Sequence, residues 1–363
     1  MNYDYIVVGH GIAGATLAYT LRKQDQQVLV IDEPKANSAS RVAAGLVNPV
    51  AGKRFAKSWL VDTLLPYADN FYDELEARFD QELFIHKPIY KVFSTIEEQN
   101  NWMAKSAEGN WSEYIGATYT QSTGQESSVQ DQFGGIMIKK GGYLRIADTL
   151  DLLLQDLQQD NALLPERFEI DQLQLVEQGV AYKNITARHV VFCEGWQVVS
   201  NPYFRWLPLQ PTKGEVLEVQ TQDFNPECIY NKAVYVVPVG EGRFKIGATY
   251  NWRQPDELPT PEGREELSER FEQITTQSYQ VSRHWAGIRP AVRDRRPLMG
   301  RHPEHAQLSV FNGMGSKGVL MAPYLADVFA KALIGGAEIL SDVHISRYYS
   351  LYYDYIKHHN QEL

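Results

Sequence analysis

The first 33 residues carry the pattern that most restricts this chain: an apolar strand, a glycine-rich turn, a helix, a second strand and an acid. Residues 5–8, Tyr-Ile-Val-Val, lead directly into residues 9–14, Gly-His-Gly-Ile-Ala-Gly, and then into an alanine-rich segment. A second apolar run at residues 27–31 ends on Asp32-Glu33. This order of elements predicts a β-α-β unit, and therefore an α/β fold in which the first helix begins at the glycine turn.

Each position of this turn has a separate physical role. Gly9 permits the tight turn, Gly11 lets the backbone approach a pyrophosphate, and Gly14 lets the helix pack closely on the strand. The first-turn N–H groups of the helix then face the phosphates, and Asp32 can accept hydrogen bonds from a ribose. The unit therefore predicts a dinucleotide site. A turn without a ligand is the alternative, and the motif alone does not distinguish FAD from NAD.

The bulk composition is that of a globular enzyme. The chain has 363 residues, of which 44% are hydrophobic and 22% charged, so it can bury a large core. Two cysteines are too few for a disulfide framework, and no leader or membrane-spanning apolar run is expected, so we expect a cytoplasmic protein without a membrane partner. The formal charge of −10 disfavours nucleic acid as a partner.

The order of expected elements predicts two interleaved domains. Pieces typical of a nucleotide domain alternate with segments rich in strands, among them residues 205–250. We expect helices at residues 143–157 and 319–333 and a strand at residues 308–312. We expect a Rossmann-like nucleotide domain from residues 1–87, 137–203 and 286–363. We expect a substrate domain with an antiparallel sheet from residues 88–136 and 204–285.

Three further segments are informative because they contain small residues, end a strand in a glycine turn, or have the pattern of paired strands. Residues 39–46 read Ala-Ser-Arg-Val-Ala-Ala-Gly-Leu, and residues 187–196 form a strand that ends in Cys-Glu-Gly-Trp. Residues 235–238 and 245–250 have the pattern of two paired strands.

The longest informative segment lies near the C-terminus. Residues 285–290 read Trp-Ala-Gly-Ile-Arg-Pro, and residues 313–318 read Gly-Met-Gly-Ser-Lys-Gly before an expected helix. Together with the N-terminal turn, these segments resemble the FAD-dependent amine oxidoreductases of the D-amino-acid oxidase type, which include glycine oxidase and sarcosine oxidase. The resemblance covers essentially the whole chain and implies non-covalently bound FAD. Cys193 and Glu194 depart from it, because the family has small residues there.

The resemblance also implies roles for individual residues. In the family, the arginine before the proline binds the substrate carboxylate, and the glycine loop covers the flavin pyrimidine at a helix N-terminus. Tyr230, Tyr235 and Tyr250 are expected to line the substrate cavity, although each can equally pack a sheet. Lys317 of the glycine loop is expected either near the flavin edge or in solvent. The residues expected at the substrate are Arg289, Tyr235, Tyr250, Tyr230 and Lys317. The residues expected at FAD are Gly9, Gly11, Ile12, Ala13, Gly14, Asp32, Glu33, Ser40, Arg41, Ala43, Ala44, Gly45, Leu46, Cys193, Glu194, Gly195, Trp196, Gly287, Gly315, Ser316, Lys317 and Gly318.

The resemblance implies an oxidase or dehydrogenase that acts on the C–N bond of a small amino acid or N-substituted glycine. Dioxygen or another acceptor would reoxidise the flavin. The sequence leaves open whether the chain forms an oligomer.

A second hypothesis is a flavin enzyme that acts on a carboxymethylaminomethyl group of a tRNA nucleoside. It rests on similarity of residues 315–318 and Arg293-Asp294 to the flavin domain of the bifunctional tRNA 5-methylaminomethyl-2-thiouridine modification enzyme. A third is a FAD-binding subunit without catalysis. Lys53, Arg54 and Lys57 form a basic cluster that is expected on the solvated surface.

Overall fold

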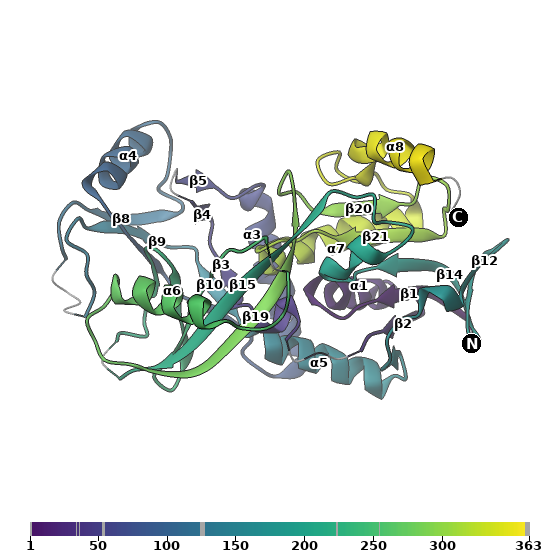
Figure 1. The fold of residues 1–363 in the computed structure, drawn as a ribbon, viewed down its shortest axis with the longest axis horizontal. Coiled ribbons are helices and arrows are strands. Elements are labelled where there is room, and N and C mark those ends of the chain that lie inside the picture. The colour runs from purple at the N-terminus through teal and green to yellow at the C-terminus, as the bar shows by residue number, and fades with distance from the viewer. Residues whose placement is uncertain are drawn as a thin grey trace. The chain divides into compact units, whose positions relative to one another are not determined.

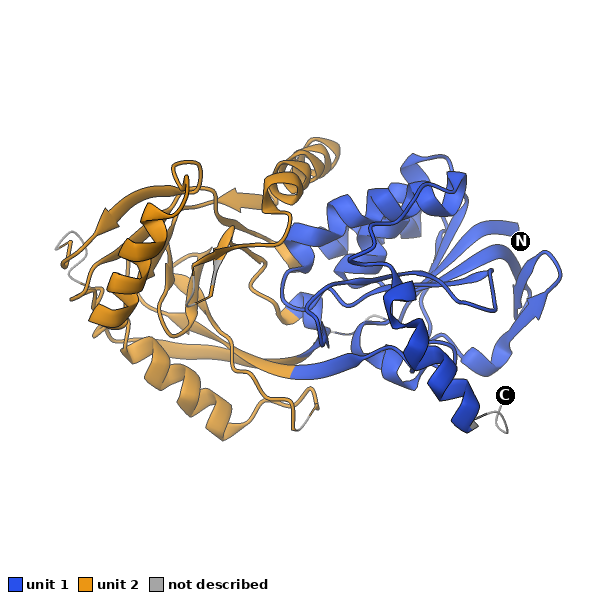
Figure 2. Cartoon of the chain, turned by 90° about the horizontal axis from the view of Figure 1, so that it is seen from above, with its two compact units in different colours: residues 1–41, 147–212, 288–363 blue, residues 42–146, 213–287 orange. Residues whose placement is uncertain are grey.

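The computed structural model describes residues 2–359 except residues 34, 36, 53, 54, 124–127, 223 and 254. The chain forms two compact units, each built from separate stretches of sequence (Figure 2). Unit 1 contains residues 1–41, 147–212 and 288–363, and unit 2 contains residues 42–146 and 213–287.

The unit boundaries differ from the expected domain boundaries. Residues 42–87, 137–146 and 286–287, expected in the nucleotide domain, belong to unit 2, and residues 204–212, expected in the substrate domain, belong to unit 1. Strand pairing explains the first difference. Strands β3 (Leu46–Val47) and β6 (Phe84–His86) both pair with β10 (Gly142–Leu144), which ties these stretches together.

Unit 1 is built on a largely parallel sheet (Figure 1). Its parallel strands are β1 (Asn2–Val8), β2 (Val28–Ile31), β11 (Leu163–Leu164), β14 (Ile185–Phe192) and β21 (Leu308–Asn312). Strands β12 (Leu173–Val176), β13 (Gly179–Tyr182) and β20 (Leu298–Arg301) add antiparallel edges. The central strands are apolar runs buried on both faces, as expected for parallel strands covered by helices.

Two helices of unit 1, α1 (Ile12–Lys23) and α7 (Gly318–Gly335), begin directly after glycine turns, and three other described helices complete the unit. The others are α2 (Ala39–Val42), α5 (Ile146–Gln159) and α8 (Tyr349–His359), with α5 beginning at the unit boundary. Helix α7 packs against α1, α1 contacts β21, and the ring of Phe329 on α7 lies 5.5 Å from that of Phe311 on β21.

Helix α7 is the one described helix that is long and apolar enough to cross a membrane by length and composition, with a mean hydropathy of 1.4. The sequence-based expectation that no apolar segment approaches this length was therefore wrong for residues 318–335. Because 56% of the segment is buried inside the structure and it packs on α1, its apolar character is that of a core helix.

Unit 2 is built on an eight-stranded sheet in the order β19-β15-β18-β17-β16-β7-β9-β8. Their bounds are β7 (Ile89–Val92), β8 (Ile115–Tyr119), β9 (Gly135–Ile138), β15 (Leu209–Gln220), β16 (Ile229–Asn231), β17 (Tyr235–Gly240), β18 (Arg243–Gly247) and β19 (Gln280–Val292). Helices α3 (Val61–Phe79), α4 (Ile96–Ala107) and α6 (Pro261–Glu272) and the short pair β4 (Val50–Ala51) and β5 (Ala56–Lys57) complete it.

The two faces of this sheet have different contents. Side chains alternate along a strand, so residues paired across strands share a face. Tyr230 pairs with Val236, which pairs with Ile246, and these three lie in the apolar core that also contains Leu267 of α6. Tyr235, which pairs with Gly247, and Lys245, which pairs with Val237, therefore lie on the opposite face.

Candidate functional site

Three glycine-containing turns meet at one edge of the unit 1 sheet. Strands β1, β2, β14 and β21 are parallel, so their carboxyl ends lie at the same edge. The residues that follow these ends are Gly9, Asp32, Cys193 and Gly313. This edge is where an open α/β sheet binds its ligand.

The first turn leaves no space for side chains. A Cβ on Gly14 would lie 1.9 Å from the carbonyl oxygen of Gly9, and a Cβ on Gly9 would lie 2.7 Å from that of Cys193. Gly9 also has a φ of +99°, which glycine adopts without strain. The packing therefore requires glycine at both positions and lets the start of α1 lie directly against the strand ends.

Two side chains hold the first turn of α1. The backbone N–H of Ile12 donates to Ser40 Oγ at 3.0 Å, and the N–H of His10 donates to Asp32 Oδ1 at 3.0 Å. Burial raises the pKa of Asp32. Arg41 forms an ion pair with Asp151 at 2.5 Å. Ser40, Arg41 and Asp32, all predicted from the sequence, thus belong to this edge.

Three other residues predicted at FAD lie in the same β-α-β unit. Ala13 is buried in α1 and Glu33 is exposed after β2. Gly11 is the residue that precedes α1.

The second turn is fixed by an asparagine at the end of β21. Asn312 Nδ2 donates to the carbonyl oxygen of Gly195 at 2.8 Å, and Trp196 lies half-buried in the 3-10 turn that follows. Cys193 is a buried free cysteine whose Cβ would lie 3.1 Å from a Cβ on Gly14, so it fills space beside α1. Burial raises the pKa of the Cys193 thiol, which keeps it protonated.

Glu194 is the acidic departure from the family pattern. Its Oε2 accepts a hydrogen bond from Asn201 Nδ2 at 2.8 Å, and burial raises the pKa of this carboxyl to about 7. A carboxyl with this pKa is partly protonated near neutral pH.

The C-terminal glycine loop connects the arginine strand to the first turn. The N–H of Gly315 donates to the carbonyl oxygen of Pro290 at 3.2 Å, next to Arg289 on β19. A Cβ on Gly318, the first residue of α7, would lie 2.7 Å from Ile12 Cγ2 of α1. The N-termini of α1 and α7 are therefore neighbours.

Lys317 is the residue that precedes α7. It is half-buried, and burial together with the positive charges of Arg296 and Arg295 lowers the pKa of its ammonium group. Ser316 is exposed beside it.

These features of unit 1 fit a dinucleotide cofactor. Two helix N-termini lie side by side, glycine stands at the positions before and within α1 where a side chain would clash, and a carboxyl group follows β2. Helix N-termini bind phosphate oxygens and stabilise negative charge that develops on a nearby group. Gly9, Gly14 and Asp32 thus lie beside the start of α1, next to the loop that carries Gly315 and Lys317, and their binding of FAD stays a prediction.

The predicted small-residue segment 43–46 belongs to unit 2. The carbonyl oxygen of Ala43 accepts a hydrogen bond from Lys245 Nζ at 3.2 Å. A Cβ on Gly45 would lie 2.0 Å from the carbonyl oxygen of Leu144, so glycine is required for the β3–β10 pairing. Ala44 and Leu46 are half-buried, and Gly287 is buried in β19.

The three predicted tyrosines have different surroundings. Tyr230 is 1% exposed and its ring lies 4.6 Å from that of Phe224, so its placement matches the packing role that the sequence left open. Tyr235 is half-buried on the other face and its Oη accepts a hydrogen bond from Asn48 Nδ2 at 2.9 Å. Tyr250 is 59% exposed.

The basic cluster is only partly described. Lys53 and Arg54 lie outside the described residues. Lys57 Nζ lies 3.3 Å from Asp62 Oδ1 and 4.8 Å from the centre of the Tyr114 ring, so this lysine takes part in a surface network.

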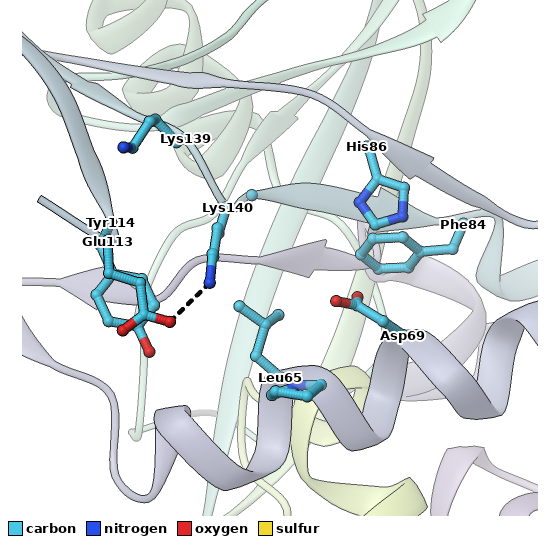
Figure 3. Close-up of a pocket in the computed structure, with 10 residues that line it drawn as sticks. Leu65, Asp69, Phe84, His86, Glu113, Tyr114, Lys139 and Lys140 are labelled. Carbon is cyan, nitrogen blue, oxygen red and sulfur yellow. Dashed lines mark hydrogen bonds and ion pairs between the residues drawn. The ribbon is translucent and has the colours of Figure 1, made fainter.

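A pocket of about 320 Å³ lies in unit 2 between α3, β6 and residues 139–141 (Figure 3). The figure shows Asp69 and His86 on one side, and Lys140, paired with Glu113 at 2.7 Å, on the other. None of the residues predicted for FAD or substrate lines this pocket.

Two polar residues of unit 2 were missed at the sequence level. Asn48 contacts Tyr235, which lies 187 positions away in the sequence. Lys245 contacts Ala43, which lies 202 positions away. Asn48 lies two residues after the small-residue segment 39–46, which was the one available signal.

Comparison with known proteins agrees with this geometry. The sequence model of the FAD dependent oxidoreductase family (DAO) matches residues 4–332. The glycine oxidase of Bacillus subtilis is 25% identical over 352 residues, which cover 89% of this chain and 90% of that protein. The tRNA 5-methylaminomethyl-2-thiouridine biosynthesis bifunctional protein MnmC of Marinobacter nauticus is 24% identical over 350 residues, which cover 90% of this chain. The aligned region spans only 54% of that bifunctional protein.

The fold has a solved counterpart. The glycine oxidase of Geobacillus kaustophilus superposes with a TM-score of 0.79 at 22% identity, covering 96% of this chain and 98% of the other. The expected α/β fold class and the expected cofactor, FAD, are thereby confirmed. With a family match over most of its length and a unit 1 edge that fits FAD, the chain belongs to the FAD dependent oxidoreductase family.

Proposed function

We propose that this FAD-dependent oxidoreductase oxidises the C–N bond of a small amino acid or N-substituted glycine. The observation that carries the proposal is the hydrogen bond from the Gly315 N–H to the carbonyl oxygen of Pro290. It ties the strand that bears Arg289 to the glycine loop at the N-terminus of α7. A guanidinium binds a carboxylate through two parallel hydrogen bonds, so a carboxylate-binding group lies in the same unit as the FAD residues.

The chain's own residues account for binding and orientation. When bound, FAD accepts the two electrons that leave the substrate as its C–N bond is oxidised. Arg289 binds the substrate carboxylate and so orients the α-carbon, and the N-terminus of α7 stabilises negative charge on its ligand. The similarity to glycine oxidases of Bacillus subtilis and Pseudomonas putida, each 25% identical over about nine tenths of this chain, supports a small amino-acid substrate.

The test compares amines that differ only in the carboxylate. Purified holoenzyme is given glycine, sarcosine and D-alanine, and in parallel the matching amines without a carboxylate, which are methylamine, dimethylamine and ethylamine. We expect release of an amine or ammonia together with an oxo acid from at least one acid, and no turnover of its carboxylate-free partner. Equal turnover of both members of a pair, or turnover of no acid, would contradict the proposal.

A second candidate substrate is a nucleoside that carries a carboxymethylaminomethyl group. Tyr250 and Trp252 are 59% and 67% exposed, and their ring centres lie 6.3 Å apart. Exposed aromatic rings can stack on a nucleobase. If the nucleoside is the substrate, Trp252→Ala should weaken its turnover and leave that of glycine unchanged.

Bound FAD that is reduced by light but by no amine would instead favour the third hypothesis, a non-catalytic FAD-binding subunit.

A further inference from the structure

The pocket in unit 2 has walls that backbone hydrogen bonds hold together. Strand β6 pairs with β10, and helix α3 contacts β6. The N–H of Lys139 donates to the carbonyl oxygen of Tyr114 at 2.8 Å, and the N–H of Lys87 donates to that of Gly141 at 3.1 Å. All residues that line the pocket lie between residues 65 and 141, so the pocket belongs to unit 2 alone. Its volume of about 320 Å³ is that of a small-molecule site, and its walls are set by the fold.

One part of the pocket lining is apolar and rigid. Leu65 of α3 and Phe84 of β6 are buried, and Pro66 follows Leu65. The Phe84 ring stacks on the Tyr72 ring with their centres 5.6 Å apart, and the His86 ring lies 4.8 Å from it in an edge-to-face arrangement. Because these contacts hold the Phe84 ring in place, this part offers a fixed apolar surface to a ligand.

Asp69 places a half-buried carboxylate in the same lining. It lies four residues after Leu65 in α3, so the two side chains lie on one face of the helix. In Figure 3 the carboxylate points toward the side of the pocket that carries Lys140. No hydrogen bond or ion pair joins this carboxylate to any residue that the structure describes, and burial raises the pKa of Asp69. An unpaired, partly desolvated acceptor gains from a ligand that brings a donor.

The lysines on the opposite side of the pocket already have acceptors. Lys140 Nζ lies 2.7 Å from Glu113 Oε1, and Lys139 Nζ donates to the carbonyl oxygen of Ser112. The positive charges of the lining are thus bonded within their own wall, whereas the negative charge of Asp69 has no such bond among the described residues. The ligand charge that complements this pocket is therefore positive.

We propose that this pocket binds an organic ammonium ion with a small apolar body, at a site that contains none of the residues predicted for FAD or substrate. The ammonium group donates to the carboxylate of Asp69, and the apolar body lies against Leu65 and the Phe84 ring. A neutral or anionic molecule of the same shape gains less, because it lacks the charged donor that Asp69 needs. The inference does not rest on the proposed function.

The test compares three small molecules that share one shape and differ in charge. At neutral pH tert-butylamine is a cation, tert-butanol is neutral and pivalate is an anion. The carbon that bears the nitrogen of tert-butylamine has no hydrogen, so FAD cannot oxidise this C–N bond and binding is measured apart from turnover. The Kd of each molecule is measured on the holoenzyme from the broadening of the single proton signal of its tert-butyl group.

The variant Asp69→Asn removes the charge and keeps the shape of the side chain. The matched control is Asp73→Asn, the same substitution one turn later in α3 at an exposed residue outside the pocket lining. We expect the wild type to bind tert-butylamine at least about 10-fold more tightly than tert-butanol or pivalate, the effect of a hydrogen bond between charged groups. Asp69→Asn should lose this preference without a lower Tm, and Asp73→Asn should keep it.

The inference is wrong if the wild type binds tert-butylamine no more tightly than tert-butanol, if Asp69→Asn binds it as the wild type does, or if Asp73→Asn weakens binding equally. Tighter binding of pivalate would indicate an anion site at the two lysines and would also overturn the inference. The comparison of the three molecules on the wild type needs no variant, so it decides the matter even if Asp69→Asn does not fold.

Discussion

Replacing Gly14 by alanine tests the account of the dinucleotide turn. The new Cβ would lie 1.9 Å from the carbonyl oxygen of Gly9, whereas Cβ atoms in proteins essentially never lie within 3.0 Å of a non-bonded heavy atom. The start of α1 or the turn must therefore move by about 1 Å or more, which costs about 1–3 kcal/mol of stability. The same movement takes the first-turn N–H groups away from the phosphates. Losing one such charge-assisted hydrogen bond weakens binding by about 10- to 100-fold.

The assay measures the Kd for FAD by titration of the apoprotein and the FAD content of the purified variant. The matched control is Gly335→Ala at the end of α7, where an added Cβ has no atom within 4 Å. We expect the control to bind FAD as the wild type does. A Gly14→Ala protein with wild-type affinity for FAD and an unchanged Tm would refute the close-approach argument.

Three further predictions concern Arg289, Glu194 and Phe329. Arg289→Lys should raise KM for a carboxylate substrate about 10- to 100-fold with FAD content unchanged, because lysine cannot form the bidentate contact. The control is Arg293→Lys, the same substitution at an exposed arginine, which should leave KM unchanged. Burial raises the folded-state pKa of Glu194 to about 7 from an ordinary 4.5, so the folded protein binds the extra proton and this carboxyl lowers stability as pH rises from about 4.5 to 7. The Tm of Glu194→Gln relative to the wild type should therefore increase over that range, and a constant difference would contradict the assignment. Phe329→Ala should lower the free energy of unfolding by about 3–5 kcal/mol in denaturant titrations, because Phe329 is fully buried in α7 with its ring 5.5 Å from that of Phe311; a loss under about 1 kcal/mol would be inconsistent with this packing.

Elements whose signals are local were predictable from the sequence. The strand expected at Leu308–Asn312 has these same bounds, and the helix expected at residues 319–333 spans Gly318–Gly335. Glycine turns and apolar runs specify such elements through neighbouring residues alone. The helix expected from Tyr143 begins instead at Ile146, because Gly142–Leu144 pairs with β3 and β6, which are distant in sequence.

The parts of the site that depend on long-range pairing could not be predicted in this way. Tyr230 and Tyr235 were equivalent at the sequence level, and only the strand register places them on opposite faces of the sheet. The contact between Asn48 and Tyr235 joins residues 187 positions apart, so no local pattern reports it. The position of residues 42–87 in unit 2 follows from the pairing of β10 with two earlier strands in the same way.

The most direct test of the central claim is the visible spectrum of the holoenzyme during anaerobic addition of amines. The account predicts that the yellow colour of FAD is lost on addition of a small amino acid or N-substituted glycine and persists with the matching amine that lacks a carboxylate. Loss of colour with both members of such a pair would contradict the role of carboxylate recognition. Persistence of the colour with every amine would contradict the proposal that the chain oxidises a C–N bond.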